Sequence, residues 1–383
     1  MRRLPALAAG LALLGATSVV PPPAPPAASG TIRVALSEFA RAAEFRGADI
    51  EVGETAPPCE RCLRTVWRTD SVRATARGPG LEVDGHQAAG FRLRSDRPIR
   101  WNGREYPGRL ELVRNGEGFA IVNETPLEDY LAGVLRSEIG EKWPLQALMA
   151  QAIVARTYAA YHRTINAGKP YHIVASTVNQ QYAGLVGGTS PIWAAIQETT
   201  GQVLLWEGEL FSAFYHTESG GFTEDPRTVF AARNMPALKP VICPFSAGAP
   251  HYYWSLDLRL TDLAEALRRA DVVVGQVQAI EITERTPSLR ASVVTVRGTR
   301  GTARLKGNDL RRMVGYDTLK STLFAVAVDG ETARFAGRGY GHGIGLCQWG
   351  AKGMADQAFS ARQILAYYYP GTTLTTLGAV AGR

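Results

Sequence analysis

The sequence is poor in cysteine: its 383 residues include four, Cys59, Cys62, Cys243 and Cys347. Cys59 and Cys62 are close enough in sequence to form a small surface disulfide in an oxidising compartment. A thioredoxin-like redox centre needs such a pair at the strand-to-helix junction of a βαβ unit. Because this pair instead follows two prolines in a loop-like stretch, the sequence argues against a redox centre.

The sequence also lacks a basic tract with interleaved aromatic residues, an internal repeat, and a second long apolar run beyond the N-terminal region. The first absence argues against a nucleic-acid partner. The formal net charge is +7, and residues 1–29 contribute two arginines and no acidic residue, which leaves +5 for the rest. A mildly basic exported chain suits an anionic partner such as a bacterial cell wall.

The N-terminal region has the pattern of a signal peptide. Arg2 and Arg3 precede an apolar run from Leu4 to Val20, and a Pro/Ala-rich segment with small residues at its end follows. We therefore expect residues 1–29 to be a signal peptide and the protein to be secreted, or periplasmic in the cell envelope. The alternative is an uncleaved membrane anchor, although the run is slightly shorter than the ~20 residues of a spanning helix.

Residues 30–115 show the pattern of short strands and turns. Asn102-Gly103 and Asn115-Gly116 are hairpin signals between strand-like stretches. A small N-terminal β-rich lobe is expected here.

The pattern changes to helices after Asn123. Thr125-Pro126-Leu127-Glu128 reads as a capping box with proline at the first helical position, and apolar residues then recur at helical spacing up to Leu135. A second helix is expected from about Pro144 to His162, and a third from Ser190 to Gly201. Strands are expected at 203–206 and 210–215. Residues 261–376 mix helices and strands, with helices expected near residues 348–356 and 360–368, the second of which begins with a capping box of Ser360 and Gln363. The fold class is α+β, a helical catalytic core packed with antiparallel β-sheets, with residues 116–376 as the main domain.

Three segments carry groups that can do chemistry. Glu138 lies where a helix ends, near Trp143, so partial burial would raise the pKa of its carboxyl toward that of a general acid. His216 precedes the turn Ser219-Gly220-Gly221, and His342 lies among the alternating glycines of residues 337–350. Taken alone, each segment also fits a solvated helix-end glutamate or a glycine-rich loop with an ordinary histidine.

Together these segments resemble the stage II sporulation protein D (SpoIID) family, which is shared with the LytB amidase enhancer. The resemblance is carried by LEDYLAGVLRSE (127–138), ALMAQAIVARTY (147–158), QYAG (181–184), His216 with Ser219-Gly220-Gly221, GHGIGLCQWGA (341–351) and YYPGT (368–372). The motifs follow in one order from about residue 100 to residue 375.

The resemblance implies a lytic transglycosylase that acts on denuded peptidoglycan glycan strands, with Glu138 as the catalytic acid. It also implies that substrate-binding residues come from the later motifs: Arg156, Tyr158, Gln181, Tyr182, His216, Ser219, Gly220, Gly221, His342 and Gln348. One carboxyl is enough, because the 6-hydroxyl of the N-acetylmuramic acid can attack its own C1 and form a 1,6-anhydro ring. No cofactor and no metal is expected.

Three alternatives remain open in the sequence. The LytB branch suggests a non-catalytic peptidoglycan-binding protein with a cell-wall amidase as partner. Glu218 places a second carboxylate in the motif region, which would permit inverting hydrolysis if it lay ~6.5–9.5 Å from Glu138 with room for a water. His216, Cys243 and His251 are potential zinc ligands, with Cys347 or a loop cysteine as the fourth, but their spacing matches no compact zinc pattern.

Overall fold

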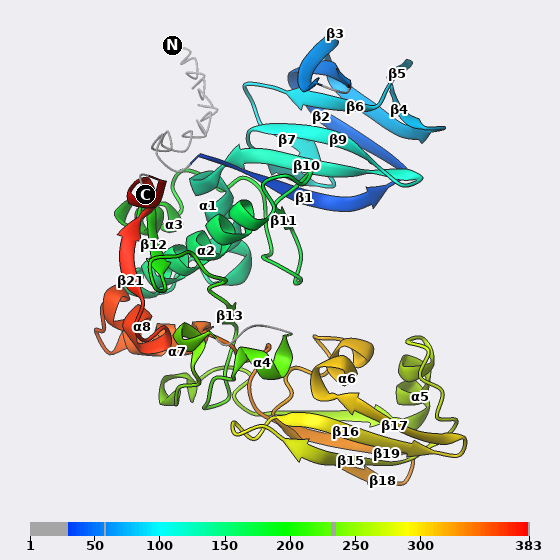
Figure 1. Ribbon diagram of the computed structural model, residues 1–383, viewed down its shortest axis with the longest axis vertical. Helices are drawn as coiled ribbons and strands as arrows, with labels where there is room; N and C mark the ends of the chain where they lie inside the picture. Colours follow the sequence, from blue (N-terminus) through cyan, green and yellow to red (C-terminus); the bar gives the residue numbers. More distant parts are fainter. Residues whose placement is uncertain (1–29, 57–58, 231–234, 382–383) are drawn as a thin grey trace, which may run out of the picture.

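A computed structural model describes residues 30–56, 59–230 and 235–381 of the chain. Three parts follow one another along the long axis of the molecule: a β-rich part at one end, a helical part in the middle and an α/β lobe at the other end (Figure 1). The structure confirms the α+β class. None of the helices in these residues is long and apolar enough to cross a membrane.

The β-rich part is one sheet of eleven strands in the described residues, with the order β11-β1-β10-β9-β6-β2-β3-β4-β5 and with β7 and β8 attached beside β2. Its strands are β1 Thr31–Ala40, β2 Ala42–Ala56, β3 Cys59–Arg77, β4 Gly80–Val83, β5 His86–Ala88, β6 Gly90–Arg94, β7 Ile99–Trp101, β8 Arg104–Tyr106, β9 Arg109–Asn115, β10 Gly118–Pro126 and β11 Ile173–Val174. The pairing is antiparallel except between β1 and β11. The sheet therefore continues through β10 and β11, beyond residue 115.

The helical part is built around two long helices and packs on this sheet. Its elements are α1 Leu127–Glu138, α2 Leu145–Ile165, α3 Ile192–Glu198, β12 Gln202–Leu205, β13 Tyr215–His216, α4 Pro226–Val229, β20 Leu346–Cys347, α7 Gln348–Asp356, α8 Ala361–Tyr368, β21 Thr373–Thr376 and α9 Leu377–Ala381, with short 3-10 helices at Pro236–Leu238 and Pro244–Ser246. Strand β12 pairs with β21, and β13 pairs in parallel with β20.

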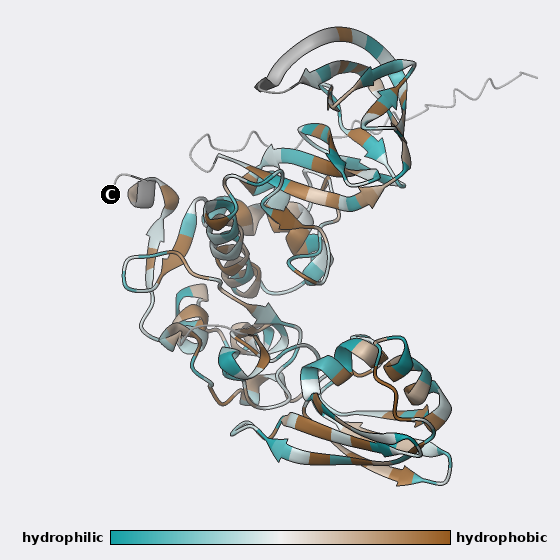
Figure 2. Ribbon diagram, turned by 45° about the vertical axis from the view of Figure 1, so that its right-hand side comes forward, coloured by the Kyte–Doolittle hydropathy of each residue, from teal (hydrophilic) through white to brown (hydrophobic). Residues whose placement is uncertain are grey.

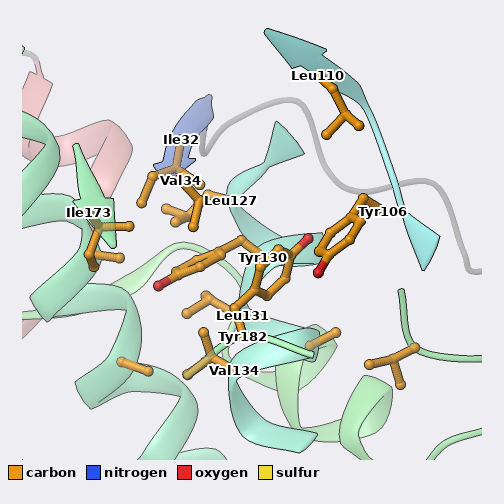
Figure 3. Close-up of a cluster of buried hydrophobic side chains, with 14 of the residues drawn as sticks. Ile32, Val34, Tyr106, Leu110, Leu127, Tyr130, Leu131, Val134, Ile173 and Tyr182 are labelled. Atoms are coloured by element: carbon orange, nitrogen blue, oxygen red, sulfur yellow. The ribbon is translucent and has the colours of Figure 1, made fainter. Parts of the chain in front are cut away.

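The amphipathic face expected for α1 is buried. Leu127, Tyr130, Leu131 and Val134 lie against side chains of the sheet, as Figure 3 shows. Every one of these four residues has no exposed surface. Burying large apolar side chains is the main stabilising contribution to such a contact, so α1 and its C-terminal Glu138 are held rigidly on the sheet.

The third part, between residues 254 and 337, has its own hydrophobic cluster. It consists of β14 Trp254–Arg259, α5 Leu260–Arg268, β15 Val277–Arg285, β16 Ala291–Gly298, β17 Gly301–Lys306, α6 Gly307–Val314, β18 Phe324–Asp329 and β19 Thr332–Gly337. Exposed residues alternate with buried or partly buried ones along β14, β18 and β19, and hydrophilic and hydrophobic colours alternate along the strands of this lobe in Figure 2. The sequence suggested no separate lobe here, because its short elements look like those of the surrounding domain.

Several local expectations are confirmed. The turns at 102–103 and 115–116 join β7 to β8 and β9 to β10. The capping box of Ser360 and Gln363 begins α8. Helices α2 and α7 lie where the sequence predicts helices.

Three local expectations are wrong. Thr125 does not cap α1, because Pro126 occupies the N-cap position and the Glu128 side chain is used elsewhere. Residues 210–214 are not a strand; β12 pairs with β21 instead of forming a hairpin with them. Cys59 and Cys62 belong to β3 rather than to a loop; their proposed disulfide concerns side chains outside the described residues.

Candidate functional site

Glu138 is the last residue of α1, and its carboxyl is only partly exposed. The backbone N–H of Gln181 donates a hydrogen bond to Glu138 Oε1 at 2.8 Å. Burial raises the pKa of Glu138, although the hydrogen bond from Gln181 and the facing side chains of Gln348 and Tyr215 oppose the rise. Because Gln181 and Gly140 beside it are exposed, a ligand in solution can reach this carboxyl.

A buried network of hydrogen-bonded side chains lies beside Glu138, and the sequence did not predict it. The Gln180 amide accepts a hydrogen bond from the Tyr130 hydroxyl at 3.0 Å and donates one to the Tyr215 hydroxyl at 3.1 Å. Since Tyr215 accepts from Gln180, its own proton is free to face the Glu138 carboxyl. Gln180 has no exposed surface, so these hydrogen bonds hold the Tyr215 side chain in position.

Strand β13 and the start of α7 bring the later motifs to Glu138. Tyr215 of β13 is paired with Leu346 of β20. Because α7 begins at Gln348, two residues after Leu346, the start of α7 lies close to Tyr215. Gln348 is buried, and its amide nitrogen has no hydrogen bond of normal geometry within the structure. Its side chain faces Glu138 closely enough to lower the pKa of that carboxyl.

Two tryptophans come from the chain segments beside Glu138 and Gln348. Trp143, which follows the end of α1, meets Trp349 of α7 with ring centroids 5.2 Å apart in an edge-to-face arrangement. Both are partly exposed. Aromatic rings with one open face offer an apolar surface on which the C–H face of a sugar can lie.

The two histidines form a separate pair behind β13. Their ring centroids are 5.6 Å apart; His216 Nδ1 donates to the Ile344 carbonyl at 3.0 Å, and His342 Nδ1 accepts from the Ile344 N–H at 3.0 Å. Burial first, and then nearby positive charge, lowers the pKa of His216 and lowers that of His342 to about 3. Both rings are therefore neutral near pH 7 and hold the glycine-rich loop rather than transfer protons.

His216 does not face Glu138. It follows Tyr215 in β13, and successive side chains of a strand point to opposite sides. The structure thus brings Gln181 and Gln348 to Glu138, whereas His216 and His342 support the strand from behind.

The turn Ser219-Gly220-Gly221 is buried and held by an arginine from the third lobe. Arg290 donates from Nη2 to the Ser219 carbonyl at 2.8 Å and to the Phe222 carbonyl at 3.1 Å. A Cβ placed on Gly343 would lie 2.5 Å from the same nitrogen, so only glycine leaves room for this guanidinium. These three turn residues organise the backbone and do not present an open polar surface.

Three residues expected to bind substrate lie in the core instead. Arg156 has no exposed surface: it forms a bidentate ion pair with Glu128, with Nη2 to Oε2 at 2.6 Å, and donates to the Gln202 carbonyl. The Tyr158 hydroxyl accepts from Asn179, and the Tyr182 hydroxyl donates to Asn123. Tyr158 and Tyr182 are 4% and 2% exposed, so all three stabilise the fold and leave little surface for a ligand.

Glu218 has other neighbours than Glu138. It lies beside Cys243 and Ser246, and burial raises its pKa to about 8. The three residues weighed as zinc ligands also have different surroundings: His216 contacts His342, Cys243 contacts Tyr368, and His251 contacts Tyr340. In residues 30–56, 59–230 and 235–381, no group of three His, Cys, Asp or Glu side chains could hold a metal ion.

Comparison with known proteins places this chain in a family. A family model described as stage II sporulation protein, SpoIID, matches residues 115–206, and one described as a domain of unknown function matches residues 245–345. An uncharacterized protein of Brachyspira hyodysenteriae is 31% identical over 280 residues, which is 73% of this chain and 74% of that protein. The chain therefore belongs to the SpoIID/LytB family.

Two relatives from Bacillus carry descriptive names. Stage II sporulation protein D of Bacillus amyloliquefaciens is 29% identical over 270 residues, covering 66% of this chain and 75% of that protein. The amidase enhancer of Bacillus subtilis is 29% identical over 294 residues, covering 64% of this chain but 40% of its own length. The SpoIID match includes Glu138 and Gln181, whereas the other family match, residues 245–345, contains the whole third lobe.

Proposed function

We propose that this chain is an exported peptidoglycan lytic transglycosylase in which Glu138 is the catalytic acid and base. The observation that carries the proposal is a partly exposed carboxyl whose pKa is raised by burial and which accepts a hydrogen bond from the Gln181 N–H. A raised pKa keeps a carboxyl protonated at higher pH, which a general acid needs. Membership of a family that includes stage II sporulation protein D and an amidase enhancer supports a role in the bacterial cell wall.

The proposed reaction needs one carboxyl. Glu138 donates its proton to the glycosidic oxygen that leaves with N-acetylglucosamine, and positive charge develops at C1 of N-acetylmuramic acid. The resulting carboxylate accepts the proton of the 6-hydroxyl of that muramic acid as its oxygen bonds to C1. The product carries a 1,6-anhydro ring, and no second carboxylate activates a water.

The neighbours of Glu138 suit both halves of this cycle. Burial favours the protonated acid before bond cleavage, whereas Gln181, Gln348 and Tyr215 stabilise the carboxylate formed afterwards. Burial and these hydrogen bonds act in opposite directions on the pKa of Glu138, which suits a group that must both donate and accept a proton. Trp143 and Trp349 would contact the sugars.

A second function is favoured by one relative. The Bacillus subtilis protein is named an amidase enhancer, and the same site in this chain would then bind glycan strands without cleaving them and would assist a cell-wall amidase. The two proposals differ in whether purified protein alone changes the mass of the glycan.

The experiment is mass spectrometry of denuded glycan strands incubated with purified residues 30–383. The transglycosylase predicts muramic ends lighter than hydrolysed ends by one water, about 18 Da. Intact strands, with stimulation of an added amidase, would favour the enhancer. Export is tested separately by N-terminal sequencing of the protein recovered outside the cytoplasm, which we expect to begin close to Gly30.

A further inference from the structure

The third lobe is inserted between two segments that lie side by side. The chain leaves the helical part just after Cys243 and returns to it at Cys347, and the separate family match, residues 245–345, falls between these two cysteines. Cys347 lies in β20, opposite His216 of β13. The backbone N–H of Cys243 donates to the Gly221 carbonyl, five residues after His216. Both crossings therefore meet behind the candidate site.

The two thiols are in contact at this junction. Both cysteines are completely buried and free, and the Cys347 thiol interacts directly with the Cys243 sulfur. They also share Gly350: its N–H donates to Cys347 Sγ at 3.3 Å, and a Cβ placed on it would lie 2.6 Å from Cys243 Sγ. Gly350 thus leaves the space in which the two sulfur atoms meet.

We propose that Cys243 and Cys347 form a disulfide that closes the base of the inserted lobe. Disulfides form and persist in oxidising compartments outside the cytoplasm, so in the cell the proposal rests on the export proposed above. The bond would join the two places where the chain crosses into the lobe. The two segments that connect the lobe to the helical part would then be covalently linked, so that residues 243–347 would form a closed loop.

The bond forms by thiol–disulfide exchange with an external disulfide as the oxidant. In a glutathione buffer, the Cys243 thiolate attacks oxidised glutathione and releases one glutathione thiolate. The deprotonated Cys347 then attacks Cys243 Sγ and releases the second, so the two protein thiols are oxidised and one glutathione disulfide is reduced. Because both sulfurs are buried, the reaction takes place during folding, before the lobe closes.

The disulfide would also position a residue of the candidate site. Cys347 is the N-cap residue of α7, and Gln348, which faces Glu138, follows it directly. A covalent bond at Cys347 restrains where α7 begins, and hence where the Gln348 amide lies. Cys243 and Cys347 are thus structural and positioning residues, not catalytic ones.

The test maps the bond directly. The chain is refolded in glutathione redox buffer, unfolded without reductant, alkylated, digested and analysed by mass spectrometry. We expect one crosslinked peptide pair joining Cys243 to Cys347, lighter by about 2 Da than the two thiol peptides together. Alkylation of both residues, or a crosslink from either to Cys59 or Cys62, would overturn the proposal. A matched variant, Cys59→Ser with Cys62→Ser, should keep the crosslink.

A second measurement tests the role in closing the lobe. Reductant should lower the midpoint of thermal unfolding of the wild type and of the Cys59/Cys62 variant. Reductant should leave the unfolding midpoint unchanged in a variant with Cys243→Ser and Cys347→Ser. Equal shifts in all three proteins would show that the bond does not support the lobe. Both experiments use the protein without glycan, so their outcome is independent of whether the proposed glycan cleavage is correct.

Discussion

The backbone N–H of Gln181 and the side chain of Glu138 are joined by a 2.8 Å hydrogen bond between residues that are 43 positions apart. The preceding residue, Gln180, turns its side chain inward to Tyr130 and Tyr215. One short segment therefore both contacts the carboxyl and orders the hydroxyl that faces it. This arrangement stabilises the ionised form of Glu138, whereas burial favours the protonated form.

Replacing Tyr215 with Phe should shift the pH dependence of cleavage. The Tyr215 hydroxyl lowers the pKa of Glu138, so its loss should raise that pKa further. Because the acid works in its protonated form, activity falls as the pH rises through the pKa, and the alkaline limb of the kcat/KM profile should move to higher pH. Tyr158→Phe is the control, since its hydroxyl bonds to Asn179. Identical profiles for both variants would contradict the assignment of Tyr215.

Arg156→Leu should destabilise the fold without changing the chemistry of the folded fraction. It leaves the buried Glu128 carboxylate without its bidentate partner, and breaking a buried pair in this way costs about 3–5 kcal/mol. Arg136→Ala removes an exposed pair with Glu141 at 3.6 Å and should cost less than ~1 kcal/mol. Denaturant unfolding measures both. If Arg156→Leu kept wild-type stability but lost glycan binding, Arg156 would be a substrate ligand after all.

Glu218→Gln should retain cleavage within about tenfold of wild type, the effect of one lost polar contact of ~1.4 kcal/mol. Products with ordinary reducing ends, together with an inactive Glu218→Gln variant, would instead indicate a hydrolase that uses Glu218 to position water.

The same variant makes a prediction about stability. Burial raises the pKa of Glu218 from 4.5 to about 8, so the protonated carboxyl is favoured in the folded state. Its contribution to the free energy of unfolding is complete below pH 4.5 and is lost as the pH rises toward 8. The stability of wild type should therefore fall over this range relative to Glu218→Gln, which cannot ionise. Parallel curves from thermal unfolding at several pH values would refute the buried, protonated state.

Sequence patterns over a few neighbouring residues correctly predicted helices such as α1 and α8. The apolar spacing of α1 and the capping box of α8 are properties of neighbouring residues, so they could be read from the sequence. The same logic failed at Thr125 and Glu128, because the Glu128 side chain that a capping box would need forms a buried ion pair instead. Only the position of Arg156, 28 residues further along the chain, decides between them.

Some residues of the candidate site could be predicted from the sequence, and others depend on contacts between distant segments. Glu138 could be predicted from its helix end and from the family resemblance. Gln180 could not, since its importance depends on Tyr130 and Tyr215, which approach it from α1 and β13. Tyr182 follows it in a recognisable motif yet faces the core, because side-chain direction within a motif is set by packing. The inserted lobe was missed because its hydrophobic cluster forms from elements that individually resemble those around it.

The most direct test compares Glu138→Gln with wild type on denuded glycan strands, with product masses and strand binding measured on the same samples. Glu141→Gln, three residues along and partly exposed, is the matched control. We predict anhydro-muramic products from wild type and from Glu141→Gln, and none from Glu138→Gln, which should still fold and still bind the strands. Anhydro products from Glu138→Gln at the wild-type rate would contradict the assignment of Glu138 as the catalytic acid.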